Sequence, residues 1–270
     1  MKKRIQPPAL SPEYSLIDSH CHLDMEASQE DISDLVASAK QCQVETIITI
    51  GIDLTSSKRA VELANTSPDI YASVGMHPHS AEQGSDAAYQ QLKELASSDK
   101  VIAYGEIGLD YAKQYAPVER QREEFARQLN LARELDLPII IHDRDAHEDT
   151  LHIIKEQGPF PAAGVMHCFS GDMAFAQQVL ALDLYISIPG IVTFKNAADL
   201  QKVAQEIPLD RMLLETDGPF LTPVPFRGKR NRPEYLLYTA AMIAELRGIT
   251  IDEVAWQTSQ NTKKLFSLPA

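Results

Sequence analysis

Short apolar runs alternate with longer segments of helical period along most of the chain. The apolar runs predict eight strands, at residues 15–19, 46–51, 70–75, 101–105, 138–141, 164–166, 184–188 and 212–215. Between them, apolar residues recur every three and four positions in segments such as 31–42, 56–66, 87–98, 118–136 and 173–183. These segments predict helices, and two further helices, at 233–248 and 252–266, close the chain.

This alternation indicates an α/β fold. Continuous apolar strands that are each followed by a helix are typical of parallel strands covered on both faces. Eight such units in 270 residues predict a single (β/α)8 TIM-type barrel rather than an open doubly wound sheet. No GxGxxG or GxxxxGK[ST] motif occurs, which removes the main support for a nucleotide-binding sheet. We expect an N-terminal extension at residues 1–14 and one barrel domain at 15–270.

The composition of the chain bears on where the protein is located and on what it can bind. The first residues lack the apolar stretch of a secretory signal and no later run reaches membrane-spanning length, so we expect a cytoplasmic protein without membrane contact. Cys21, Cys42 and Cys168 show no CxxC spacing and are expected to be reduced. The net charge of −13 argues against a protein that gathers polyanions by its overall field, so nucleic acid would have to be bound locally. No obligate protein partner is predicted.

Histidines and carboxylates follow the apolar runs. In an extended chain alternate side chains point the same way, so the two histidines of the motif HCH face one side and Cys21 the other. Barrel enzymes build their sites at the carboxyl ends of the strands, where we expect these side chains to meet. The candidate metal ligands are His20, His22, Glu106, His142, His167 and Asp217.

Imidazoles and carboxylates together suit divalent metal ions. The last strand of a closed barrel neighbours the first, so Asp217 joins His20 and His22 in a first site. His142 and His167, on the fifth and sixth strands, form a second site, and Glu106 is placed to bridge both. We therefore predict two divalent cations per chain, with Zn, Mn, Mg, Co and Ni not distinguished by the sequence. Two ions about 3.5 to 4 Å apart would activate a water molecule for hydrolysis.

Several longer motifs resemble the TatD family of metal-dependent deoxyribonucleases. They are HxH on the first strand, GMHPH at 75–79, GEIGLDY at 105–111, IHDRDAHEDTL at 141–151, HCFSGD at 167–172, GIVTFKNA at 190–197, ETDGPFLTP at 215–223 and PFRGKRNRP at 225–233. The resemblance covers nearly the whole chain. It implies a metal-dependent hydrolase barrel of the amidohydrolase type, with ligands on the same six residues. Members are described as cutting DNA, often from a 3′ end, although many carry only a general hydrolase label. The basic start before Leu16 is longer than the family pattern.

The roles of three more positions follow from their placement. Asp217 is predicted to be both ligand and general base, because a carboxylate beside an activated water can take its proton. Glu215 lies two residues earlier on the same face and would orient the water or a ligand; it could equally be a buried partner for a barrel cation. We assign His77 to a scissile phosphate, with the alternative that its His-Pro turn only shapes the loop.

Basic residues beyond the strands are predicted to bind phosphate. The predicted contacts are Arg144, Lys195, Arg227 and Lys229, with Arg230 and Arg232 in the same run. The alternative is a solvated surface. Phe220, Phe226 and Tyr111 flank the same rim and could stack on bases or simply pack.

Other residues have no assigned chemistry. Asp110 and Asp143 are left open between supporting a ligand and capping a loop, whereas Trp256 and Asn261 are expected to be structural.

The predicted function is hydrolysis of phosphodiesters. We expect an exonuclease that cuts single-stranded or frayed DNA by attack of metal-bound hydroxide. The alternative is an amidohydrolase acting on a small-molecule ester, amide or phosphoester. Such enzymes often bridge their metals with a carbamylated lysine from the fourth strand, where this chain offers Glu106 and no lysine. A third alternative is a metal-binding or DNA-binding scaffold without turnover.

Overall fold

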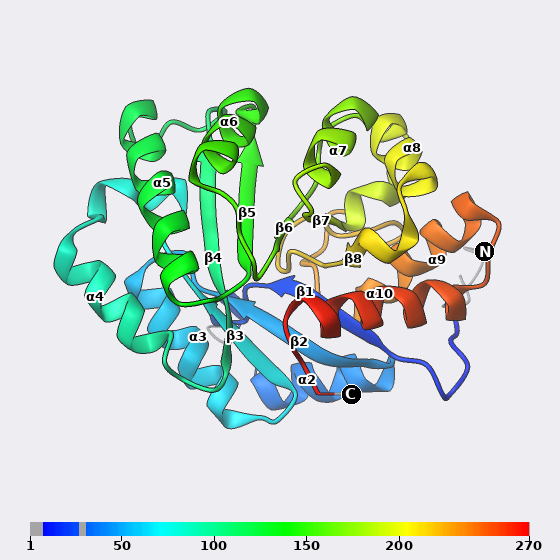
Figure 1. The fold of residues 1–270 in the computed structure, drawn as a ribbon. Coiled ribbons are helices and arrows are strands. Elements are labelled where there is room, and N and C mark those ends of the chain that lie inside the picture. Colours follow the sequence, from blue (N-terminus) through cyan, green and yellow to red (C-terminus); the bar gives the residue numbers. More distant parts are fainter. Residues whose placement is uncertain (1–7, 27–30, 270) are drawn as a thin grey trace.

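Eight parallel strands lie in sequence order around a nearly closed barrel, and helices cover its outside (Figure 1). The computed structural model describes residues 8–26 and 31–269. The strands are β1 (Leu16–Cys21), β2 (Val44–Ile50), β3 (Ile70–Val74), β4 (Val101–Asp110), β5 (Ile139–Arg144), β6 (Gly164–Met166), β7 (Tyr185–Ile188) and β8 (Met212–Leu214). This confirms the predicted (β/α)8 TIM-type barrel.

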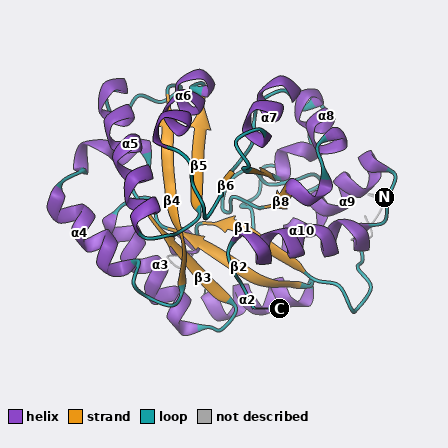
Figure 2. Ribbon diagram, viewed as in Figure 1, coloured by secondary structure: helices purple, strands orange, loops and turns teal. Residues whose placement is uncertain are grey.

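The helices form the outer layer (Figure 2). They are α1 (Leu23–Glu26), α2 (Ile32–Gln41), α3 (Leu54–Thr66), α4 (Asp86–Leu95), α5 (Val118–Glu134), α6 (His147–Gln157), α7 (Met173–Leu180), α8 (Ala198–Glu206), α9 (Leu236–Arg247) and α10 (Ile251–Leu265). Short 3-10 turns are η1 (Pro78–Gln83), η2 (Gly190–Thr193), η3 (Leu209–Arg211) and η4 (Pro233–Tyr235). None of the helices in the described part of the chain has the length and apolar character needed to cross a membrane.

The core has two parts because successive side chains of each strand point to opposite faces. The larger cluster packs between the sheet and the helices, with Tyr104, Ile141 and Met166 among its members. A smaller one includes Ile140 and Val165, which lie two residues before His142 and His167 and therefore on the same face of their strands. An apolar layer thus lies beneath the histidines inside the barrel. Side chains of α10 and the segment that follows it join this layer.

Three strands run further than their apolar runs predicted. β1 continues to Cys21, β4 to Asp110 and β5 to Arg144, so His20, Glu106 and His142 lie within strands rather than after them. The predicted ends were wrong because polarity was taken as the end of a strand. Here the polar side chains face one another inside the barrel, so the backbone ladder continues past them: Gly108 on β4 still pairs with His142 on β5.

A bulge in β4 separates Tyr104 from Ile107, where the pairing with β5 shifts register. Gly105 lies in this bulge with φ 157°, and a Cβ there would lie 2.6 Å from the Ile140 carbonyl oxygen. Only glycine fits such an approach. The bulge turns the following residue, Glu106, into the barrel interior.

The barrel closes between β1 and β8 without a regular ladder. Backbone contact at this seam consists of Asp217 N–H donating to the His20 carbonyl (2.9 Å) and His22 N–H donating to the Gly218 carbonyl (2.8 Å). The buried carboxylate of Asp18 accepts from both the backbone N–H (2.9 Å) and the hydroxyl (2.5 Å) of Thr216. Side-chain hydrogen bonds therefore contribute much of the connection between the first strand and the last.

The end of the chain covers this seam. Helix α10 packs against both β1 and β8, in front of them in the view of Figure 1. Asn261 on α10 donates to the carbonyls of Leu209 and Met212 (2.8 Å each), which agrees with its expected structural role. Trp256 is 53% exposed and adds little to the core.

The described part of the N-terminal extension lies on the barrel. Leu10 is buried in the larger core cluster, and Ser11 bonds through its N–H and hydroxyl to Asp252 on α10 (3.0 and 2.6 Å). The basic residues at the very start of the extension lie outside the described residues.

Candidate metal centre

Glu106 lies at the middle of a buried cluster that joins opposite sides of the barrel. Its Oε2 is 3.4 Å from His20 Nε2 and 3.9 Å from His22 Nε2. Its Oε1 is 2.7 Å from His142 Nδ1 and 2.8 Å from His167 Nε2. One carboxylate oxygen thus faces each pair of histidines, which is the arrangement of a bridging ligand.

The first half of the centre comes from β1 and the turn after β8. Asp217 Oδ1 lies 3.4 Å from His22 Nε2 and 3.9 Å from His20 Nε2. Asp217 has a left-handed backbone, with φ 53°, a conformation that aspartate tolerates better than most residues. This turn brings its side chain toward the two histidines. The trio predicted from the ends of the chain is therefore assembled in space.

The second half comes from β5 and the residue after β6. His142 Nδ1 and His167 Nε2 are 3.4 Å apart. Each imidazole has a buried carboxylate behind it: Asp110 Oδ2 lies 3.4 Å from His142 Nε2, and Glu215 Oε1 lies 3.6 Å from His167 Nδ1. Carboxylates in this position fix the orientation of a ligating ring and strengthen it as a ligand.

Glu215 therefore faces the side of His167 that is turned away from Glu106. Its Oε1 also accepts a hydrogen bond from the Cys168 backbone N–H (2.5 Å). Of the roles expected for Glu215, orienting a ligand fits this position. Among the described residues, no lysine or arginine of the barrel pairs with the Glu215 carboxylate.

His77 also reaches the cluster, with Nε2 3.4 Å from Glu106 Oε1. Its Nδ1 accepts a hydrogen bond from the His79 backbone N–H (3.1 Å). Burial, followed by the charge of His142, lowers the pKa of His77 to about 4, so the ring is neutral near pH 7. With Nδ1 as acceptor, the proton of the neutral ring is on Nε2. His77 therefore points a donor into the centre and offers no lone pair to a metal there, although it lies within ligand distance of Glu106 and His142.

Sequence reasoning missed His79 as a member of this network. Its Nε2 lies 2.8 Å from Asp110 Oδ2, and Asp110 Oδ1 accepts from the Lys113 backbone N–H (2.8 Å). Asp110 thus both supports His142 and caps a turn, the two roles left open for it. The HPH spacing was the available signal, but the partner of His79 depends on the fold of the loop after β4.

Asp143 belongs to a different group. It is buried and pairs with His147 on α6, whose ring stacks on Phe175 at 4.0 Å. It lies next to His142 in β5, so its side chain points to the opposite face of that strand. Asp143 therefore anchors α6 rather than contributing to the centre.

Charge in the centre suits a cation. Burial alone would raise the pKa of Glu106, but His167 and His77 hold it well below its usual range. Burial and the neighbouring His167 lower the pKa of His20 to about 3. At neutral pH the bridge is thus an ionised carboxylate and His20 keeps a lone pair for a ligand bond.

The hydrogen bonding of the histidine ring nitrogens indicates whether a metal ion fits this site. His20 is fully buried, yet both its ring nitrogens lack a hydrogen-bond partner, as does His22 Nδ1. Buried polar atoms are rarely left in this state. Ligand atoms on a tetrahedral ion of bond length about 2.1 Å are about 3.4 Å apart. The observed spacings of 3.4 to 3.9 Å between His20, His22, Glu106 and Asp217 match that value, so these residues fit a divalent ion.

The cysteines stay outside the ligand set. Burial, then Asp217 and Glu215, raise the pKa of the Cys168 thiol well above its usual range, so it is not the thiolate that metals bind. The Cys21 thiol points toward the Gly218 carbonyl (3.7 Å). None of the candidate metal-binding groups among the described residues includes a cysteine.

The basic loop after β8 divides into two parts. Arg227 lies over the ring of Phe194 at 4.4 Å and Lys229 over that of Phe226 at 5.4 Å, and both side chains are exposed. By contrast, Arg230 donates to the Met25 carbonyl (2.8 Å) and Arg232 pairs with Glu234 (3.4 Å). The first two can meet a ligand, whereas the last two hold the loop in place.

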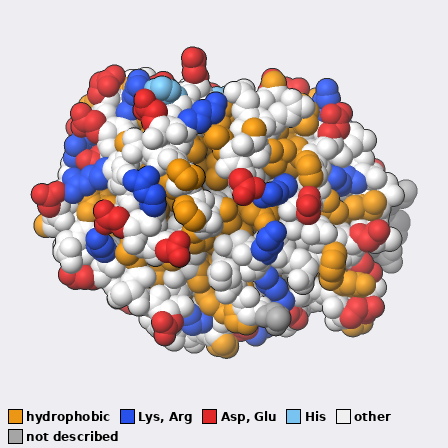
Figure 3. Space-filling view, in the orientation of Figure 1, with side chains coloured by type: hydrophobic (Ala, Val, Ile, Leu, Met, Phe, Trp, Pro, Cys, Tyr) orange, Lys and Arg blue, Asp and Glu red, His pale blue; other side chains and the backbone are white. Residues whose placement is uncertain are grey.

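Lys195 and Arg144 are exposed on segments that follow β7 and end β5. On the face shown in Figure 3, acidic and basic side chains are interspersed, so that face offers no field of one sign. Any anion must therefore be held by a few local cations, as the net charge of −13 also requires.

The aromatic candidates differ in exposure. Phe226 stacks on Tyr235 at 4.2 Å, and the Tyr111 hydroxyl donates to Asp149 (2.6 Å), so both serve packing. Phe220 is 48% exposed and meets His22 edge to face at 6.0 Å. Of the three rings expected at the rim, Phe220 alone is both open and in contact with a candidate ligand.

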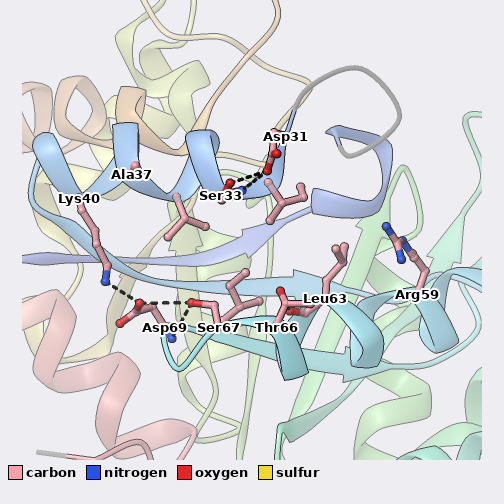
Figure 4. Close-up of a pocket in the computed structure, with 12 residues that line it drawn as sticks. Asp31, Ser33, Ala37, Lys40, Arg59, Leu63, Thr66, Ser67 and Asp69 are labelled. Atoms are coloured by element: carbon pink, nitrogen blue, oxygen red, sulfur yellow. Dashed lines mark hydrogen bonds and ion pairs between the residues drawn. The ribbon is translucent and has the colours of Figure 1, made fainter.

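A surface groove between α2 and α3 lies elsewhere (Figure 4). It has a volume of about 640 Å³, is lined by apolar side chains such as Ile32 and Leu63, and carries an ion pair between Lys40 and Asp69 (2.5 Å). None of the candidate metal ligands lines it. The chemistry of the molecule is therefore centred inside the barrel.

Comparison with known proteins agrees with this geometry. The family described as TatD related DNase matches residues 17–267. The uncharacterized metal-dependent hydrolase YabD of Bacillus subtilis is 45% identical, with 94% of this chain and 99% of that protein covered. The corresponding hydrolase YcfH of Escherichia coli is 39% identical, with 94% and 97% covered.

The fold agrees as well. The crystal structure of YJJV, a TatD homolog from Escherichia coli, superposes with a TM-score of 0.89 at 35% identity and covers 94% of this chain and 98% of its own. The family match spans all six candidate ligands. We conclude that this chain belongs to the TatD family of metal-dependent hydrolases.

Proposed function

We propose that this protein hydrolyses phosphodiester bonds in single-stranded or frayed DNA, as an exonuclease that requires two divalent cations. The observation that carries the proposal is the carboxylate of Glu106, whose two oxygens face two separate groups of histidines. His20, His22 and Asp217 would hold one ion, and His142 and His167 the other. The relatives at 45% and 39% identity are themselves named uncharacterized hydrolases, so the nuclease activity is our inference.

Divalent ions held by these residues would supply positive charge that stabilises phosphoryl oxygens and would lower the pKa of the attacking water to about 7. The chain provides the remaining chemistry. Asp217 takes the proton of the attacking water at its carboxylate, which is 12% exposed and so can be reached from the site. His77 donates from Nε2 to an oxygen of the scissile phosphate, since its Nδ1 is engaged by the backbone.

Exposed cations would bind the phosphates on either side. Arg227 and Lys229 belong to the loop that follows Asp217, and they lie over the rings of Phe194 and Phe226. Arg144 and Lys195 border the same end of the barrel. A cation held over an aromatic ring has a more defined position and less side-chain entropy to lose on binding. We assign these four residues to phosphate contacts.

The amidohydrolase alternative is less well supported. Glu106 occupies the bridging position and no lysine is present within β4. A small neutral metabolite would also not need exposed arginine and lysine at the rim. The cytoplasm is the proposed location, in agreement with three cysteines that form no disulfide.

Titration of metal into chelated protein tests the proposal. Single-stranded DNA, duplex DNA, a simple phosphodiester, and a panel of carboxylic esters and amides would each be offered with Zn, Mn, Co, Ni and Mg. We expect cleavage of single-stranded DNA and of the simple phosphodiester, and none without metal. Cleavage of esters or amides alone would favour the amidohydrolase, and metal binding without any turnover would favour a scaffold.

A further inference from the structure

Two exposed aromatic side chains lie at the edge of the metal centre. Tyr115 is 65% exposed and Phe220 is 48% exposed. They come from the loops that follow β4 and β8, at the carboxyl ends of these strands. A single exposed aromatic ring is ordinary on a protein surface. These two differ because each one contacts an imidazole of the network around Glu106.

Phe220 marks one end of the network. Its ring meets the imidazole of His22 at a centroid distance of 6.0 Å and an angle of 71°. Its backbone N–H donates to the Asp217 carbonyl (2.8 Å), and the neighbouring Pro219 carbonyl accepts from Asn231 N–H (3.0 Å). The ring is therefore held at a fixed place beside the half of the centre that His22 and Asp217 form.

Tyr115 marks the other end. Its ring meets the imidazole of His79 at 4.6 Å and 74°. His79 is fixed by its 2.8 Å contact with Asp110, the carboxylate that also lies behind His142. Tyr115 is thus connected, through His79 and Asp110, to the half of the centre that His142 and His167 form.

The two rings are therefore on opposite sides of Glu106, whose Oε2 faces the His22 side and whose Oε1 faces the His142 side. In both contacts the rings meet at more than 70°, so neither aromatic ring is stacked face to face on a histidine, and the exposure of Tyr115 (65%) and Phe220 (48%) leaves ring surface open to a ligand. Phe226, in the same loop as Phe220, is in contrast covered by Tyr235. An uncovered face beside a reaction centre suits a flat ring of the substrate.

We propose that Phe220 and Tyr115 are stacking platforms for the two nucleobases on either side of the scissile phosphate. This inference rests on the proposed phosphodiesterase function and adds a determinant of substrate choice to it. Stacking accepts every base because every base has a π-face, so these rings favour unpaired nucleotides without reading sequence. They also distinguish a nucleic acid strand from a phosphodiester that carries no bases.

The test compares substrates that differ only in their bases. Phe220→Ala and Tyr115→Ala would be assayed, with the metal-loaded full-length protein, on a single-stranded oligonucleotide and on versions with one abasic residue on either side of the terminal phosphodiester. Trp256→Ala, which removes a similarly exposed ring from α10, is the matched control. Phe220→Trp and Tyr115→Phe keep an aromatic face at each position. A fully abasic dinucleotide reports the chemistry alone.

We expect each alanine variant to raise KM for the complete oligonucleotide about 10-fold with kcat little changed. The effect should disappear on the substrate that lacks the base facing the changed ring, and the aromatic variants should behave as wild type. Turnover of the fully abasic dinucleotide should be the same in wild type, both alanine variants and Trp256→Ala.

Two results would overturn the inference, and they differ from failure of the proposed function. An unchanged KM in both alanine variants shows that the rings do not stack on bases. An equal loss on complete and abasic substrates shows that they only support the centre. If wild-type protein with metal cleaves no phosphodiester, with or without bases, the proposed function itself fails and the inference falls with it.

Discussion

The two halves of the candidate metal centre are built by different means. His142 lies in β5 and His167 directly follows the neighbouring strand β6 of the same parallel sheet, and each has a buried carboxylate behind it, Asp110 or Glu215. His20 lies in β1 and His22 directly after it, and Asp217 reaches them only across the seam where the barrel closes. One half is thus oriented by its own strands and supporting carboxylates, and the other by closure of the fold.

This difference has consequences for metal binding. A ring whose far nitrogen faces a carboxylate is held ready for an ion, so less free energy is lost in ordering it. In the other half, the far nitrogens are Nδ1 of His20 and Nδ1 of His22, and neither pairs with a carboxylate in the described part of the chain. We therefore expect the ion at His142 and His167 to bind more tightly, and the ion at His20, His22 and Asp217 to exchange more readily.

The largest expected effect is on catalysis by the half at the seam. Asp217→Asn should lower kcat by about 10²- to 10⁴-fold, because the amide can neither take a proton from water nor balance the charge of an ion. Its thermal unfolding should remain cooperative. Steady-state kinetics with a simple phosphodiester measures the change, and near-normal turnover would remove Asp217 from the role of base.

The supporting carboxylates test the other half. Asp110→Asn and Glu215→Gln should each weaken the tighter ion by about 10- to 100-fold while the weaker ion is affected less. Calorimetric titration of metal into the chelated protein separates the two affinities. Asp143→Asn is a matched control, because Asp143 is buried next to His142 but pairs with His147. Equal weakening of both ions in the Asp110 and Glu215 variants would remove the distinction between the halves.

The seam between β1 and β8 can be weakened without replacing a candidate metal ligand. Asp18→Ala leaves the buried N–H and hydroxyl of Thr216 without their acceptor, which should cost about 1 to 3 kcal/mol in the free energy of unfolding. The ion at His20, His22 and Asp217 should lose more affinity than the ion at His142 and His167. Urea unfolding and metal titration measure the two effects, and Asp18→Asn should recover part of both. A uniform loss of affinity in Asp18→Ala would contradict the account.

The halves also differ in proton binding. Burial lowers the pKa of His142 and His167, but Asp110 and Glu106 more than offset this at His142, and Glu106 and Glu215 raise the pKa of His167 well above its usual value. In the half at the seam the two histidines diverge: Asp217 and Glu106 outweigh burial and raise the pKa of His22, whereas burial and His167 lower that of His20 to about 3. A raised pKa in the folded state gives the metal-free protein stability that is present below about pH 6.5 and is lost as pH rises through the raised values.

Metal binding should compensate for the stability that the metal-free protein loses as pH rises. The increase in Tm on adding zinc to chelated protein is therefore expected to be larger at pH 8 than at pH 6. Differential scanning calorimetry at these two values, with chelator as the reference, measures it. An increase that is the same at both, or larger at pH 6, would show that protons and metal do not compete at these histidines.

The smallest expected effect lies at the rim. Replacing Arg227 and Lys229 together by alanine should weaken binding of single-stranded DNA and reduce the slope of log affinity against log salt by about 1.4, because two counterion-releasing contacts are lost. Lys93 and Lys155, in the last turns of α4 and α6, provide a double alanine control of equal charge. An unchanged slope for the loop variant would show that these two residues do not touch phosphate.

Much of the fold followed from the sequence because its strands are buried on both faces. Such strands are continuous apolar runs, and an amphipathic helix after each one leaves few arrangements. The same reasoning placed the six candidate ligands at one end of the barrel. It misplaced His20, Glu106 and His142 relative to the strand ends, because apolar runs do not show that polar side chains can pair across a barrel interior.

The remaining features of the site depend on contacts that the spacing of residues along the sequence does not reveal. The acceptor role of His77 Nδ1 is set by the backbone N–H of His79, and His79 is set by Asp110. The position of Tyr115 depends on the fold of the loop between β4 and α5. Asp18 adjoins the HxH motif, yet its partner Thr216 is 198 residues away along the chain. Apart from the local bond between His77 and His79, these contacts form only when segments distant in the sequence come together in the fold.

The arrangement of ions around Glu106 is the central claim, and anomalous diffraction from crystals grown with manganese or zinc tests it most directly. We predict two peaks, one on each side of the Glu106 carboxylate, the first bound by His20, His22 and Asp217 and the second by His142 and His167. His77 should bind neither ion. A single peak, or an ion bound by His77, would contradict the account.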